Sequence, residues 1–143
     1  MNYRIAIGSD HRGFQLKSYL LNENLSCEWL DCGTFSSERT DYPLFVLPVI
    51  SALHAGTVDG GILICGTGVG MAIAANRHKG IYAGLVWNEE IARLAKEDDN
   101  INVLVLPADY MSDQTAVACI SSWISAVFKK GRYQERLSLI DSL

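Results

Sequence analysis

Short apolar runs alternate with helix-like patterns from one end of the chain to the other, and this alternation restricts the fold more than any other feature. We expect strands at residues 4–9, 27–31, 61–65, 82–86 and 102–106. The third and fifth runs are apolar almost throughout, as expected for strands that helices cover on both faces. The alternation predicts an α/β fold, with stacked β–α–β units around a parallel sheet of five strands.

Two helical patterns lie at the C-terminal end. The first covers residues 113–130, with Asp113 as its cap and Gly131 as its end. The second follows Gly131 and predicts a C-terminal helix, in which Arg132 and Arg136 stand one helical turn apart and share a face. Two guanidinium groups so placed can converge on one anion, although they can also form a solvated helix face.

The composition fits one domain, residues 1–143, with a sizeable core, because 49% of the residues are hydrophobic. Sixteen acidic and twelve basic residues leave a net charge of -4, and no basic run suggests a nucleic-acid or membrane partner. The N-terminus lacks the apolar region of a signal peptide, and no apolar run reaches the roughly 20 residues of a membrane span. We therefore expect a cytoplasmic protein.

The four cysteines, Cys27, Cys32, Cys65 and Cys119, form no CxxC pair and no metal-ligand spacing with the three histidines. We therefore expect no metal site. Cys27 and Cys119 are best interpreted as small buried hydrophobic residues.

A glycine-rich turn follows Cys65, and it is the strongest local signal in the chain. Gly66, Gly68 and Gly70 stand at alternate positions, so the backbone can approach a ligand and present several N–H groups to it. Such amides at the start of a helix suit a phosphate or a developing oxyanion. A dinucleotide fingerprint would need glycine, and a phosphatase loop arginine, at the position of Met71; the Gly-Lys-Ser/Thr ending of a P-loop is also absent.

Cys65 has two interpretations. It can be a buried strand residue beside a tight turn, or, because the backbone donors next to it stabilise a thiolate, it can be a base or a nucleophile. Proton abstraction next to a carbonyl needs a base at carbon and donors at the oxygen that becomes negative, as in an aldose–ketose isomerase. Thr67 can pass a proton between two substrate oxygens, or can bond its own backbone as a turn residue.

Two further polar clusters adjoin predicted strands: Asp10 and His11 follow the first strand, and Asp98 and Asp99 precede the fifth. Because ligands bind beyond the carboxyl ends of the strands in such a sheet, we expect both clusters to face the crevice next to Cys65. Asp10 can alternatively cap a helix, and His11 can be a solvated side chain.

In these residues the chain resembles the type B ribose-5-phosphate isomerases, within the wider family that includes galactose-6-phosphate isomerase. The likeness covers nearly the whole chain, in residues 8–14, 16–17, 36–43, 59–70, 73–76, 102–104 and 131–136. It implies a three-layer Rossmann-like sandwich that works without a cofactor. It also implies a homodimer or a dimer of dimers, with sites shared between subunits.

The resemblance further implies a role for each matching residue. Cys65 would move a proton between C1 and C2 with the help of Thr67, and the anion hole would comprise Gly66, Gly68, Val69 and Gly70. Asp10 and Tyr42 would contact sugar hydroxyls, and the phosphate would be held by His11, Arg132 and Arg136.

Two positions depart from the family's pattern. Asp98-Asp99 stand where the family usually has His-Asn, whose His assists ring opening, and Asp109 stands where it usually has an Arg that reaches the phosphate. Carboxylates near a phosphate should weaken its binding. We expect an isomerase that interconverts ribose 5-phosphate and ribulose 5-phosphate. The alternatives are an isomerase of a tetrose or hexose phosphate, and a catalytically weakened partner subunit that binds sugar phosphate.

Overall fold

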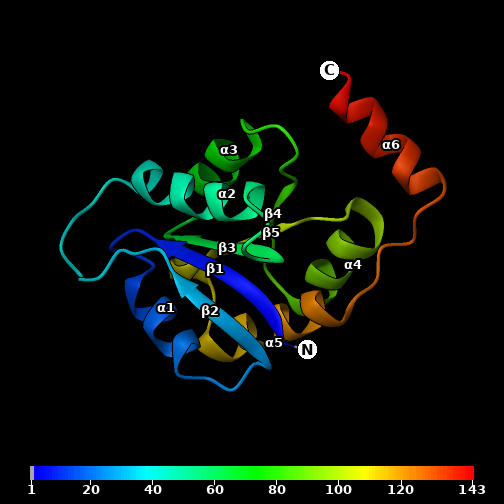
Figure 1. Cartoon of the computed structure of the whole chain (residues 1–143). Helices are drawn as coiled ribbons and strands as arrows, with labels where there is room; N and C mark the ends of the chain where they lie inside the picture. The colour runs from blue at the N-terminus through cyan, green and yellow to red at the C-terminus, as the bar shows by residue number, and fades with distance from the viewer. Residues whose placement is uncertain (1) are drawn as a thin grey trace.

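A parallel sheet of five strands forms the middle layer of the molecule, in the order β2-β1-β3-β5-β4 (Figure 1). The computed structural model describes residues 2–143. Its strands are β1 (Tyr3–Ser9), β2 (Cys27–Asp31), β3 (Gly60–Cys65), β4 (Ala83–Leu85) and β5 (Val103–Pro107). Every neighbouring pair is parallel. The predicted α/β fold is confirmed, although β4 is shorter than expected.

Helices cover both faces of this sheet. The helices of the chain are α1 (Phe14–Leu21), α2 (Val46–His54), α3 (Val69–Asn76), α4 (Glu89–Asp99), α5 (Asp113–Ser125) and α6 (Arg132–Asp141), with short 3-10 helices η1 (Tyr42–Phe45) and η2 (Ala108–Tyr110). One face carries α2 and α3, and the other carries α1, α4 and α5. The implied three-layer sandwich is therefore confirmed.

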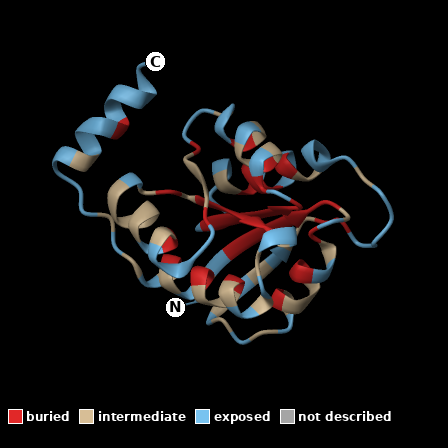
Figure 2. Ribbon diagram, turned by 180° about the vertical axis from the view of Figure 1, so that it is seen from behind, coloured by how far each residue is buried: buried red, intermediate tan, exposed pale blue. Residues whose placement is uncertain are grey.

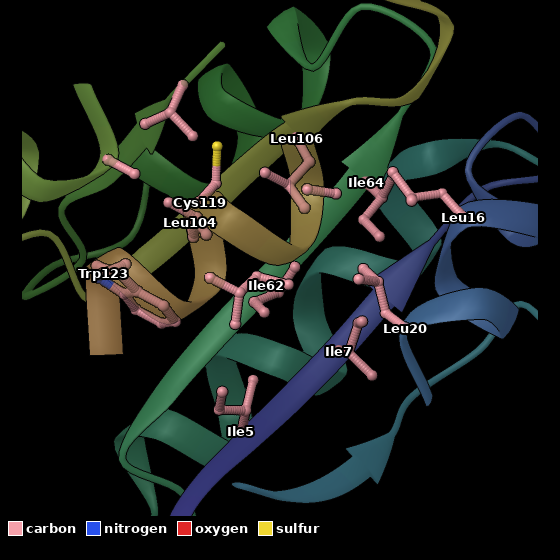
Figure 3. Packing of buried hydrophobic residues seen from close by; sticks show 14 of the residues in the cluster. Ile5, Ile7, Leu16, Leu20, Ile62, Ile64, Leu104, Leu106, Cys119 and Trp123 are labelled. Atoms are coloured by element: carbon pink, nitrogen blue, oxygen red, sulfur yellow. The ribbon is translucent and has the colours of Figure 1, made fainter. Parts of the chain in front are cut away.

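The alternation of side chains along β3 separates two hydrophobic cores. Ile62 and Ile64 belong to the core under α1 and α5, together with Trp123 (Figure 3). Leu63 and Cys65 belong to the core on the opposite face, under α2 and α3. Every residue of β3 is buried, and Figure 2 shows the central strands as the buried middle of the fold. This double burial fixes Cys65 at the carboxyl end of a central strand.

The caps of the last two helices differ from the prediction. Ser112, not Asp113, caps α5, because its Oγ accepts a hydrogen bond from the backbone N–H of Thr115 at 3.1 Å. Gly131 does not end α5; it is the N-cap of α6, with a φ of 56° that glycine adopts without strain.

The predicted length of α5 is also wrong, because the helix ends at Ser125 and residues 126–130 form a connecting segment. Val127 fits the helical periodicity but is 75% exposed, so burial does not favour a longer helix there. The backbone N–H of Lys129 instead donates to the carbonyl of Glu97 on α4 at 2.9 Å.

The C-terminal helix α6 stands apart from the sheet, at the opposite end of the molecule from the loop that follows β2 (Figures 1 and 2). Its Leu137 is buried, and the hydroxyl of Tyr82 donates to the carboxylate of Asp141 at 2.6 Å. Leu139 and Ile140 are 69% and 51% exposed. The helix is thus an arm that only a few side chains attach to the body.

Candidate active site

The thiol of Cys65 lies at the carboxyl end of β3, next to the start of α3. Cys65 is 5% exposed, and its Sγ accepts a hydrogen bond from the backbone N–H of Gly68 at 3.1 Å. Gly68 has a φ of 79° and is the N-cap of α3, so the amide is directed at the sulfur by the turn that starts the helix. The turn thus places one backbone donor directly against the sulfur.

Two of the other cysteines, Cys27 and Cys119, have thiols with raised pKa values. Burial raises the pKa of Cys27 and of Cys119 to about 11, so both thiols stay protonated at neutral pH. Cys119 is fully buried and Cys27 is half-buried, which confirms the interpretation of Cys119 as a core residue.

Two side chains lie against the glycine-rich turn. A Cβ on Gly66 would collide with the guanidinium of Arg12, and a Cβ on Gly70 would collide with the ring of Tyr42. Glycine at these two positions therefore lets the Arg12 guanidinium and the Tyr42 ring lie close to the backbone of the turn. Tyr42 lies beside the turn, as its expected contact with the sugar requires.

The residues after β1 reach the same edge of the sheet. The buried carboxylate of Asp10 accepts hydrogen bonds from the backbone N–H groups of Arg12 at 2.9 Å and of Gly13 at 3.1 Å, so it stabilises the turn. His11 accepts a hydrogen bond at Nδ1 from the backbone N–H of Thr40 at 3.2 Å. In the neutral imidazole this bond places the proton on Nε2, which makes that atom a donor.

Thr67 is exposed, and its Oγ1 accepts a hydrogen bond from the backbone N–H of Val69 at 3.3 Å. The hydroxyl therefore acts as a turn residue and keeps its own proton available to a ligand. Both interpretations of Thr67 are compatible with this geometry.

Within one chain, Asp98 and Asp99 do not lie in the crevice next to Cys65. They end α4, just before the amino end of β5, whereas Cys65 pairs with Pro107 at the carboxyl end of β5. A strand rises about 3.3 Å per residue, so the length of β5 separates the two sites. The helix of a β–α–β unit runs back across the sheet, and it brings residues that precede a strand to the amino edge.

Asp98 instead contacts the segment that leads to α6. Its Oδ1 accepts a hydrogen bond from the Nζ of Lys129 at 2.9 Å, and this bond raises the pKa of Lys129. Lys129, Arg132 and Arg136 surround the ring of Tyr133, with their charged groups 5.1, 5.3 and 5.2 Å from its centre. Arg132, followed by Lys129, lowers the pKa of Tyr133. The arm and the segment that leads to it thus carry a cluster of three cations.

Asp109 follows β5 and does lie at the edge that carries Cys65, since its backbone N–H donates to the carbonyl of Gly66 at 3.0 Å. Its carboxylate forms an ion pair with the guanidinium of Arg12. Sequence reasoning missed Arg12, although a basic residue in the turn after a strand was a visible signal. The negative charge expected to weaken phosphate binding is compensated within the chain.

A cavity of about 700 Å³ lies elsewhere, between β4, the end of α4 and α6. Asp99 and Tyr82 line it, and Cys65 does not. We place the candidate site at Cys65, because directed donors and a nucleophilic atom meet there, whereas the cavity is the space left between the arm and the body.

Among residues 2–143, no three His, Cys, Asp or Glu side chains form a group that could hold a metal ion. No helix in this range is long and apolar enough to cross a membrane.

Comparison with known proteins gives a consistent result. A family model described as Ribose/Galactose Isomerase matches residues 5–140. The chain is 40% identical to ribose-5-phosphate isomerase B of Escherichia coli, over 98% of this chain and 95% of the relative. The solved structure of a ribose 5-phosphate isomerase from Thermotoga maritima superposes with a TM-score of 0.97 at 40% identity, over 100% of both chains. Ribose-5-phosphate isomerase B from Mycoplasma genitalium, with bound ribulose 5-phosphate, gives 0.89 at 36% identity, over 99% of this chain and 96% of that one.

Proposed function

Because the chain belongs to the ribose/galactose isomerase family and is an aldose–ketose isomerase of sugar phosphates, we propose that it interconverts ribose 5-phosphate and ribulose 5-phosphate in the cytoplasm. The observation that carries this proposal is the thiol of Cys65, held by the N–H of Gly68 at the start of α3. The Mycoplasma relative that binds ribulose 5-phosphate supports the choice of substrate.

In the proposed mechanism the thiolate of Cys65 takes the proton from C2 of the open-chain aldose. The electrons of that C–H bond form the C1–C2 double bond, and the carbonyl electrons move to O1, which gives an enediolate. The amides of the turn from Gly66 to Gly70 stabilise its negative oxygen. Thr67 moves a proton between O1 and O2, and the thiol of Cys65 returns its proton to C1 to give the ketose.

Phosphate recognition at Cys65 requires a second copy of the chain in this proposal. Arg132 and Arg136 lie on the arm, at the end of the molecule away from the loop after β2 (Figure 1). We propose a homodimer, or a dimer of dimers, in which the arm of one subunit reaches the Cys65 turn of its partner. Val69 and Ile73, half-exposed on α3 beside this turn, and the exposed apolar side chains of the arm support such a contact.

Replacement of Cys65 tests the mechanism. Cys65→Ala should lower kcat by at least about 100-fold, because a positioned base contributes about 10²–10⁴ to the rate. Deuterium incorporation from solvent at C1 or C2 measures the step directly, and Cys119→Ala, a cysteine in the core, is the matched control. If Cys65→Ala keeps more than about a tenth of the turnover, a loss under about 1.4 kcal/mol, Cys65 is not the base.

The substrate is tested with a panel of tetrose, pentose and hexose phosphates. We expect the highest kcat/KM for the pentose pair. A higher value for a tetrose or hexose phosphate would replace the proposed substrate. Binding without turnover of any of them would identify the chain as a sugar-phosphate-binding partner subunit.

A further inference from the structure

Arg12 connects the carboxyl ends of three strands. It stands in the turn after β1, its guanidinium lies against Gly66 after β3, and it forms an ion pair with Asp109 after β5. The backbone N–H of Asp109 donates to the carbonyl of Gly66 at 3.0 Å, so Asp109 also contacts the turn directly. Arg12 also donates its own backbone N–H to the carboxylate of Asp10 at 2.9 Å. The guanidinium is therefore held over the first residue of the turn that follows Cys65.

The glycine at position 66 is explained by this contact. Gly68 needs glycine for its positive φ, but Gly66 is not among the glycines with positive φ in the described part of the chain. What a side chain at position 66 would meet is the guanidinium of Arg12. The sequence thus leaves out a Cβ at the point where the cation approaches the turn.

Stability does not account for the arrangement. The side chains of Arg12 and Asp109 are 48% and 39% exposed, and ion pairs at such sites typically contribute about 0–1 kcal/mol. Asp109 raises the pKa of Arg12, so the cation is permanent. Asp109 accepts from one Nη atom, and a guanidinium carries about five N–H donors, so donors remain for an anion at the mouth of the turn.

We propose that Arg12 is a catalytic cation that donates to the enediolate oxygen, and that Asp109 is the residue that positions it. This inference rests on the proposed function. When Cys65 takes the proton from C2, negative charge develops on O1 next to the amides of the turn. A fixed cation beside those amides stabilises this charge more than it stabilises the neutral carbonyl, so it raises kcat and leaves KM nearly unchanged.

Arg12→Met removes the charge and keeps an unbranched side chain of similar length. We expect kcat to fall about 10- to 100-fold while KM changes less than about threefold, and we expect Arg12→Lys to recover part of kcat. The variant should lose affinity for a phosphorylated hydroxamate, which mimics the planar enediolate, by the same factor. Its affinity for the corresponding sugar-alcohol phosphate, which lacks a carbonyl, should stay the same. An unchanged kcat, or a raised KM with kcat unchanged, would overturn the assignment.

Gly66→Ala provides an independent test, because the added methyl group would displace the flexible Arg12 side chain while Cys65 remains. In a double-mutant cycle the effect of Gly66→Ala on kcat should be much smaller in the Arg12→Met background. Additive effects would show that the two residues act separately and would contradict the proposed contact. Asp109→Asn, which releases the guanidinium without removing it, should lower kcat by only a few-fold and less than Arg12→Met does.

The two levels of proposal fail in different ways. If Cys65→Ala is inactive and Arg12→Met keeps its kcat, only the role of Arg12 is lost. If Cys65→Ala remains active, the cysteine mechanism itself is wrong, whatever Arg12→Met does. Thermal melting of each variant checks that the fold is intact, and the exposed positions of Arg12 and Asp109 predict little change in Tm.

Discussion

The turn after Cys65 and the arm formed by α6 are built in opposite ways. The turn lies at the end of a buried central strand, and backbone hydrogen bonds from Gly68 and Asp109 hold it in place. The arm stands off the body, with Leu137 as its buried side chain and its cations in solvent.

This difference separates two tasks that one sugar-phosphate isomerase must combine. Proton transfer needs atoms held in place, and the sheet provides that at its carboxyl edge. Recognition of phosphate needs positive charge at the right distance, which an exposed helix can provide. In one chain the turn lies at the carboxyl edge of the sheet and the arm stands apart from the sheet, so the proposed site is complete only when two subunits meet.

The largest effect expected from this division is complementation between a chain without the base and a chain without the arm's guanidinium groups, measured at substrate concentrations well below the raised KM of the second chain. Cys65→Ala lacks the base, and the double variant Arg132→Ala, Arg136→Ala lacks the arm's guanidinium groups. When equal amounts are unfolded and refolded together, about a quarter of the sites should be intact, because each mixed dimer has one complete site. The mixture should therefore show about a quarter of the turnover of the same amount of wild-type protein. If the mixture is no more active than its two parts, each site is built from one chain.

Removal of one guanidinium from the arm should affect binding more than chemistry. Arg132→Ala or Arg136→Ala should raise KM about 10-fold or more with little change in kcat, because a charged hydrogen bond to phosphate contributes about 1.5–3 kcal/mol in ground and transition states alike. Steady-state kinetics measure both constants. Arg93→Ala is the matched control, since Arg93 pairs with Glu97 on the exposed face of α4. An unchanged KM in both variants would show that Arg132 and Arg136 form a solvated helix face and do not bind the phosphate.

Asp98 should influence the choice between cyclic and open-chain substrates. A histidine exchanges protons near neutral pH and can therefore open a sugar ring, whereas the carboxylate of Asp98 holds the Nζ of Lys129. We expect Asp98→His to gain a few-fold in kcat/KM for ribose 5-phosphate and little for ribulose 5-phosphate. Asp98→Asn is the control, because it also releases Lys129 but cannot titrate. If the wild-type protein converts ribose 5-phosphate rapidly and Asp98→His shows no gain, another group opens the sugar ring.

The smallest effect concerns the attachment of the arm. The hydrogen bond to Asp141 raises the pKa of Tyr82 to about 12 from its ordinary value of 10.0. A raised pKa means that the bond's contribution is complete below pH 10 and is lost as the pH rises towards 12. Tyr82→Phe should therefore cost about 0.5–1.5 kcal/mol at neutral pH and remove this dependence. Urea unfolding of both proteins between pH 8 and 12 measures both effects, and equal free energies of unfolding at every pH would rule out the attachment.

The elements of the fold could be predicted because each leaves a local pattern. The uninterrupted apolar run that ends at Cys65 reports burial on both faces of β3, and that burial is visible along a few adjacent residues. Gly68 could be recognised for a similar reason, since its backbone conformation is a local property. The end of α5 was missed because Val127 continues the apolar periodicity although no element packs on it.

The sequence by itself determined the strands, the glycine-rich turn after Cys65 and the spacing of Arg132 and Arg136, because neighbouring residues encode all three. Only the tertiary structure decided which edge of the sheet each polar cluster reaches. It placed Asp98 at the amino edge, beside Lys129, because α4 runs back across the sheet before β5 begins. It also paired Arg12 with Asp109, 97 positions along the chain, because parallel strands bring their carboxyl ends together however far apart they lie in sequence.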